Sequence, residues 1–349
     1  MELLDLLRFL LLLSVLIFVH EGGHFLVAKL SGVRVEEFGF GIPPRVWGKK
    51  FKDTIYSLNL LPIGGFVRLK GEEGGEALGF GSADSFAVKS KFKRTFIIAA
   101  GALGNFVLAW LIFSLLWSLG MLVPAGKVLV NEVSTGSPAQ AAGIEPGDFI
   151  LSFNGEKTET AGELIELTRA SLGSRVLLEV ESDEIAREAT LTVRAVPPEG
   201  EGPIGFAIAT AAVEEKVPFW KAPAVGLLDT FETVGLMLKG LTQTVVGLFR
   251  GEELQVGGPV AIYALTGTVA DGGFKPFINF MAILSLNLVV VNLLPIPALD
   301  GGRILFIAIE AIRGKRLSPK TEHLVNSVGF AFLILLIVLL SIKDIRTFF

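Results

Sequence analysis

The sequence predicts an α-helical polytopic membrane protein with four transmembrane helices and an inserted water-soluble α+β domain. The first observation is composition: 51% of the 349 residues are hydrophobic and only 19% are charged, which is too apolar for an ordinary soluble protein of this length. The second is the presence of four long apolar stretches. The third is a polar, strand-rich segment that lies between the second and the third of them.

Composition also excludes several classes of function. The net charge of -4 is spread along the chain without a basic stripe, so we expect no nucleic-acid partner. There is no cysteine, which excludes disulfides, thiolate metal ligands and a cysteine nucleophile. The N-terminal apolar stretch lacks a basic start and a small-residue cleavage site, so we interpret it as a retained membrane helix rather than a signal peptide.

The predicted spans follow from length, because a helix needs about 20 apolar residues to cross a bilayer. Four stretches qualify, residues 3–30, 96–123, 277–312 and 324–342. A further stretch, residues 224–249, has apolar residues at helical spacing with charges interspersed, which favours an amphipathic helix on the membrane surface. Lys and Arg cluster after the first span, before the second, and between the third and fourth, so these loops should be cytoplasmic and both termini and the soluble domain extracytoplasmic.

Two β-type runs surround a Pro-Ile-Gly-Gly turn within residues 54–70, on the cytoplasmic side of the first two spans. This pattern predicts a membrane-associated β-hairpin. The hairpin is either a short connector or an exposed strand edge to which an extended peptide adds itself as another strand. In the second case, Gly64 and Gly65 are candidate substrate contacts.

The soluble segment contains a recognisable signature. Residues 137–156 run from a small-residue helix through a Gly-Ile pair and Pro-Gly-Asp into a strand that ends in Asn-Gly, and this resembles the signature of PDZ domains. Such a domain either binds peptide ends or strands, or acts as a plug that restricts access to the membrane region. The predicted domains are residues 1–123, a PDZ domain at 124–200, a linker with the amphipathic helix at 201–276, and residues 277–349.

The first span contains His20-Glu21-Gly22-Gly23-His24, an HExxH pattern. Two histidines four residues apart project from one helix face and can bind one metal ion, and the intervening glutamate can act as general base. Ionisable groups inside a bilayer are costly, so a role as ordinary core residues is the weaker interpretation.

A catalytic zinc needs a third protein ligand. The remaining histidine, His323, lies in a basic stretch before the fourth span, so the candidates are Asp300 and Glu310 in the third span. Asp300 should lie at the depth of His24, whereas Glu310 should lie near the cytoplasmic surface as an interfacial charge. The predicted metal ligands are therefore His20, His24 and Asp300.

Two prolines and two glycines around Asp300 predict a broken helix at membrane depth, which must be buried or line a wet cavity. Asn287 and Asn292 precede the break. Their amides could hold an unwound substrate by its backbone, or could make helix-to-helix hydrogen bonds.

Taken together, several motifs resemble those of the bacterial site-2 proteases, which are intramembrane zinc metalloproteases. The motifs are HEGGHF, FGFG at residues 38–41, LPIGGFVRL, GALGNF at residues 101–106, the PDZ segment, GGP at residues 257–259 and NLLPIPALDGGR. The resemblance implies one Zn²⁺ held by His20, His24 and Asp300, Glu21 as base, and Asn292 and Pro297 in substrate handling. It also implies a multi-pass protein of the bacterial inner membrane.

The implied partners are the lipid bilayer and single-span substrates such as anti-sigma factors already cut by another protease, or remnant signal peptides. One PDZ segment is present where the best-studied enterobacterial type has two. The alternatives are a metal-ion transporter, which would usually have more polar residues along a path, and a non-catalytic PDZ scaffold, which would not need the complete set of polar residues.

Overall fold

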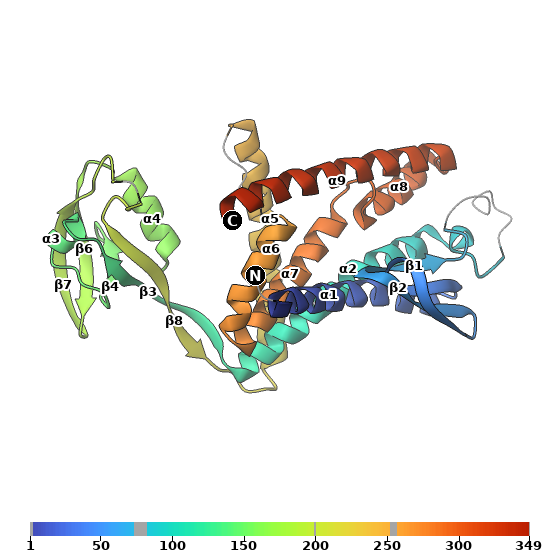
Figure 1. Cartoon of the computed structure of the whole chain (residues 1–349), viewed down its shortest axis with the longest axis horizontal. Helices are drawn as coiled ribbons and strands as arrows, with labels where there is room; N and C mark the ends of the chain where they lie inside the picture. The colour runs from blue at the N-terminus through green and yellow to red at the C-terminus, as the bar shows by residue number, and fades with distance from the viewer. Residues whose placement is uncertain (1–2, 73–81, 199, 252–256, 349) are drawn as a thin grey trace. The chain divides into compact units, whose positions relative to one another are not determined.

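A computed structural model describes residues 3–72, 82–198, 200–251 and 257–348 of the chain. The chain divides into two compact units, one formed by Met1–Ser118 with Pro218–Phe349 and the other by Leu119–Val217. Figure 1 shows that the first unit is mainly helical and that the second is built on a sheet.

Within the described residues, four helices are long and apolar enough to cross a membrane, and each corresponds to one predicted span. They are α1 (Leu3–Leu30), α2 (Lys91–Leu119), α7 (Phe274–Leu293) and α9 (Pro319–Phe348). The second prediction ran too far, to residue 123. Gly120 leaves the helix with φ +104°, and strand β3 (Met121–Val133) begins directly after it.

Helix α2 is the most enclosed of the four. Half of its most apolar window is buried, against 6% for α9. Glycines let α1 approach it closely: a Cβ on Gly23 would lie 2.1 Å from the carbonyl oxygen of Ala100, and one on Gly104 would lie 2.8 Å from that of Val19. Small residues at such contacts allow backbones to pack in a membrane, where hydrophobic attraction between helices is weak.

The predicted third span, residues 277–312, is two helices. Helix α7 ends at Leu293, an irregular segment follows, and α8 (Asp300–Arg313) begins six residues after the Leu294 cap. In the irregular segment Ala298 has φ +74°. Cβ atoms on Gly301 and Gly302 would collide with the carbonyl oxygens of Leu294 and Ile296. The two glycines therefore allow the first turn of α8 to pack directly against the irregular segment.

The predicted hairpin within residues 54–70 does not form. Strands β1 (Val35–Phe51) and β2 (Thr54–Leu69) make one sheet in which residues 37–42 pair on one side with residues 55–61, and residues 35–40 pair on the other side with residues 65–69. The two runs of β2 therefore flank β1 instead of pairing with each other. Turn residues in a sequence indicate pairing between neighbouring runs only. Here both runs pair with β1, which lies about twenty residues before the first of them.

This arrangement leaves residues 65–69, called the edge strand below, at one border of the sheet. Residues 45–51 pair with the outer side of residues 54–59 and form the opposite border. Gly39 makes the pairing next to the edge strand possible, because a Cβ there would lie 2.4 Å from the ring of Phe66.

Helices α5 (Ala222–Phe249) and α6 (Pro259–Asp271) complete the first unit. Helix α5 packs on α2, where Gly226 lies against Ser114 and the Trp117 indole donates to Asp229 at 3.0 Å. Asp344 of α9 accepts hydrogen bonds from the first amides of α6, those of Gly258 and Ala261, and so satisfies a helix end inside the membrane unit.

The second unit has its own hydrophobic core and the strand order β7-β6-β4-β3-β8, with β5 paired to β4. It extends beyond the predicted range 124–200, because β8 pairs along β3 as far as Met121 and Glu215. The predicted linker at 201–276 therefore begins with a strand of this unit. The remaining elements are α3 (Pro138–Ala141), β4 (Phe149–Phe153), β5 (Glu156–Lys157), α4 (Ala161–Ala170), β6 (Arg175–Ser182), β7 (Ile185–Thr192) and β8 (Phe206–Glu215).

Candidate metal centre

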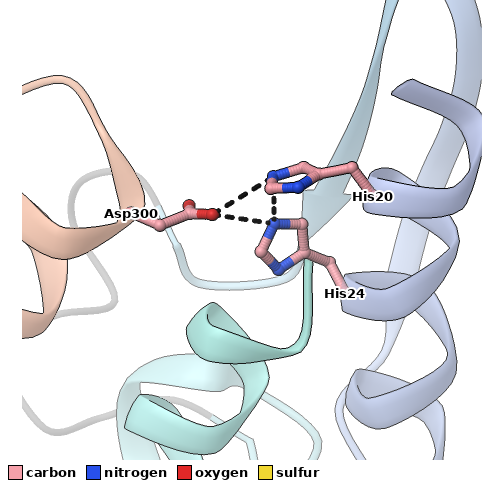
Figure 2. A group of neighbouring side chains, drawn as sticks. All are labelled: His20, His24 and Asp300. Atoms are coloured by element: carbon pink, nitrogen blue, oxygen red, sulfur yellow. Dashed lines mark hydrogen bonds and ion pairs between the residues drawn. The ribbon is translucent and has the colours of Figure 1, made fainter. Parts of the chain in front are cut away.

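Three side chains from two distant helices converge in the membrane unit. His20 and His24 project from the same face of α1, and the Asp300 carboxylate approaches them from the first turn of α8 (Figure 2). The two Nε2 atoms are 3.2 Å apart, and Oδ2 of Asp300 lies 3.2 Å from that of His20 and 3.3 Å from that of His24. All three side chains are largely shielded, with 12–13% of each exposed.

These distances fit a tetrahedral zinc ion. Bonds of about 2.0–2.1 Å to ligands at tetrahedral angles place neighbouring ligand atoms about 3.3 Å apart. The three measured separations have that value, and Oδ2 of Asp300 is buried without a hydrogen-bond partner among the described residues. The residues present therefore fit three protein ligands with a fourth position open to water or substrate.

The backbone break places Asp300 at this point. Asp300 is the first residue of α8, where a carboxylate interacts favourably with the positive end of the helix dipole. The break itself is held from α9, since the Asn326 amide oxygen accepts from the backbone N–H of Ala298 at 3.2 Å. The Pro297 ring packs nearby against Gly329 of α9.

A cavity of about 310 Å³ surrounds the three candidate ligands. Glu21 and Asn292 also line it, together with Phe66, Val67 and Leu69 of the edge strand. Of the other residues predicted to contact substrate, Gly65 lies beside Glu21, whose Cγ would be 3.2 Å from a Cβ on Gly65. Gly64, Pro297 and Asn287 are outside the lining of this cavity, and Asn287 is exposed on α7.

Comparison with known proteins gives the family of the chain. Residues 8–336 match the model of peptidase family M50. The chain belongs to that family. The zinc metalloprotease RasP of Geobacillus kaustophilus is 32% identical, over 99% of this chain and 98% of that protein, and the regulator of sigma-W protease RasP of Bacillus subtilis is 30% identical over 98% of both. The solved PDZ domain of an SdrC-like protein of Listeria monocytogenes covers 25% of this chain, with 22% identity and a TM-score of 0.22.

As a member of family M50 with four apolar helices, the chain is a zinc metalloprotease and a multi-pass membrane protein. This result favours the enzyme over the two alternatives that the sequence left open, a metal-ion transporter and a non-catalytic scaffold.

The other acidic candidate of the third span has a different environment in this M50 protease. The Glu310 carboxylate pairs with the Arg94 guanidinium at 2.5 Å and with that of Arg316 at 3.4 Å. Arg94 is buried and belongs to α2, so Glu310 connects α8 to α2 near the end of α8. The sequence predicted only an interfacial charge at Glu310, because local spacing does not reveal a partner on another helix.

A second ion pair lies beside the metal cavity. Glu72, three residues beyond the edge strand, pairs with Arg303 of α8 and also accepts the backbone N–H of Leu69 at 3.2 Å. Arg303 is one helical turn after Asp300, and both Glu72 and Arg303 line the cavity. The pair therefore connects the edge strand to the helix that carries the third candidate ligand. Arg303 ends the NLLPIPALDGGR motif, but no local pattern in the sequence pairs it with Glu72.

Replacement of Gly101 by Ala is expected to reduce zinc affinity at least tenfold. A Cβ at this position of α2 would lie 2.3 Å from Nε2 of His24 and 2.7 Å from that of His20, so it would displace the imidazoles. Gly22→Ala is the matched control, because it lies within the HExxH segment and a Cβ there meets no atom within 4 Å. Chelator competition on both purified variants measures the effect, and equal affinities would contradict the contact.

Proposed function

We propose that this protein is an intramembrane endopeptidase that cleaves transmembrane segments of other membrane proteins. The observation that carries the proposal is the common cavity of His20, His24, Asp300 and Glu21. It is bordered on one side by the edge strand, whose outer side pairs with no other strand among the described residues. A zinc protease hydrolyses a peptide bond where water, the metal and an extended substrate backbone meet, and this cavity offers positions for all three.

The roles of the side chains follow from their chemistry. A zinc ion held by His20, His24 and Asp300 would polarise the scissile carbonyl and acidify a water molecule. Glu21 lies on the same helix as both histidines and lines the cavity, so its carboxylate is placed to accept the water proton and to return it to the leaving amine. Asn292 has an amide that can hydrogen-bond the substrate backbone beside the scissile bond.

The edge strand supplies the substrate's backbone partners. A transmembrane helix uses its own carbonyl and N–H groups, so it must unwind before cleavage. Inside a membrane the freed groups need new partners, and strand addition to residues 65–69 provides them. Because Phe66, Val67 and Leu69 also line the metal cavity, a peptide added there lies next to Glu21.

Cysteine cross-linking tests the docking edge. The chain has no cysteine, so one introduced at Arg68 on the edge strand is the sole thiol. With Glu21→Gln as background to trap substrate, we expect Arg68→Cys to form a disulfide with single-cysteine substrates near the cut site. Trp47→Cys on the opposite border is the control, because Trp47 is exposed like Arg68. Cross-linking from Trp47→Cys alone would contradict the proposed edge.

The finer assignments of substrate and topology belong to the same proposal. We propose single-span substrates such as anti-sigma factors already cut by another protease, or remnant signal peptides. The name of the Bacillus subtilis relative, regulator of sigma-W protease, supports a link between the substrate and a sigma factor. The distribution of Lys and Arg supports extracytoplasmic termini and a cytoplasmic β1-β2 sheet in the bacterial inner membrane. The soluble unit, with its PDZ signature at residues 137–156, would then screen substrates on the extracytoplasmic side.

A further inference from the structure

Each candidate zinc-binding imidazole has a second nitrogen with a partner of its own. Nδ1 of His24 is 2.9 Å from the backbone carbonyl oxygen of Ile97, which fixes the proton on Nδ1 and leaves the lone pair of Nε2 for a cation. Nδ1 of His20 instead faces the side-chain amide of Asn105, at 3.4 Å from Nδ2. The imidazole of His24 is therefore oriented by a backbone carbonyl, and that of His20 by a side chain, which a substitution can change.

The amide of Asn105 can present either of its two ends to His20. Its nitrogen suits an imidazole whose Nδ1 has a lone pair, whereas its oxygen suits one whose Nδ1 is protonated. If Nε2 of His20 is to bind zinc, the proton must be on Nδ1, and then only the amide oxygen is a suitable partner. Rotation of the amide exchanges atoms that have nearly the same shape.

The surroundings of Asn105 support this second arrangement. The residue is fully buried, and its Oδ1 has no hydrogen-bond partner among the described residues. Its backbone position is fixed independently, because the Ser285 hydroxyl of α7 donates to the carbonyl oxygen of Asn105 at 2.8 Å. The amide oxygen is thus available next to His20, on a backbone held by another helix.

We propose that Asn105 is a positioning residue for the metal centre, whose amide oxygen accepts from Nδ1–H of His20 and keeps the Nε2 lone pair directed at zinc. Outer partners of this kind typically change metal affinity 10–100-fold when removed. The inference rests on the proposed zinc ligands and adds a role that the ligands themselves do not require.

Three variants distinguish this role from simple helix packing. Asn105→Leu keeps the approximate volume and removes the acceptor, so zinc affinity should fall 10–100-fold. Asn105→Asp keeps an acceptor and removes the donor, so it should retain affinity within about threefold. Ser285→Ala removes a hydrogen bond to the same residue without changing the amide, and should leave affinity unchanged because the helical hydrogen bonds of α2 still hold the Asn105 backbone.

The measurements are chelator competition for zinc and the visible spectrum of the Co²⁺-substituted protein, which reports ligand geometry without activity. We expect Asn105→Leu to change the Co²⁺ spectrum and Asn105→Asp to preserve it. Equal zinc affinity and spectra for Asn105→Leu and wild type would overturn the inference, as would a loss of affinity in Asn105→Asp equal to that in Asn105→Leu. Failure of the proposed metal site gives a different result. If His20 is not a zinc ligand, His20→Ala will also keep wild-type zinc affinity.

Discussion

Replacement of Glu21 by Gln is expected to lower cleavage of a transmembrane substrate by about a thousandfold while zinc stays bound. The substitution preserves the shape of the side chain and removes the carboxylate that accepts a proton, and general acid–base groups contribute typically 10²–10⁴-fold. The ligands His20, His24 and Asp300 are untouched, and their mutual contacts do not include Glu21. Metal analysis should therefore give wild-type stoichiometry.

The experiment uses the full chain in lipid nanodiscs with a reporter that carries one candidate transmembrane segment, and mass spectrometry locates the cut. Glu166→Gln is the control. It makes the same chemical change at an exposed residue of the second unit, far from the cavity residues in sequence. Cleavage at the wild-type rate by Glu21→Gln would exclude Glu21 as the base. A cut outside the apolar segment would contradict intramembrane cleavage.

Replacement of Asp300 by Asn is expected to lower zinc affinity at least a hundredfold and to abolish cleavage. The carboxylate supplies the only negative charge among the three candidate ligands, and a neutral amide is a much poorer zinc ligand. Folding stability should report the same loss, because a ligand stabilises only the state that binds it. Added zinc should raise the unfolding temperature of the wild type and leave that of Asp300→Asn unchanged.

Glu310→Gln is the matched control for this change, since Glu310 is the other acidic residue on α8 and pairs with arginines. We expect it to keep full zinc stoichiometry, with any loss confined to thermal stability. Loss of zinc in Glu310→Gln together with its retention in Asp300→Asn would reverse the assignment of the third ligand.

Much of the fold could be predicted because lipid imposes a local rule. A backbone in hydrocarbon must satisfy its own hydrogen bonds, so each span appears as a long apolar run. Four such runs overlap α1, α2, α7 and α9, and the third of them also includes α8. The boundary at Gly120 and the flanking of β1 by both halves of β2 were not predicted, because a positive φ and a distant strand partner leave no periodic pattern.

The sequence by itself determined the pair of histidines, since two residues four apart on any helix share a face, and it restricted the third ligand to two carboxylates. Expected depth in the membrane already favoured Asp300, but only the tertiary structure brings Asp300 to the imidazoles and Glu310 to Arg94. The close approach of Gly101, the amide of Asn105 and the Glu72–Arg303 pair likewise emerge from packing. Local spacing fixes the direction of a side chain on its own helix, but the partner that it meets depends on how distant segments pack.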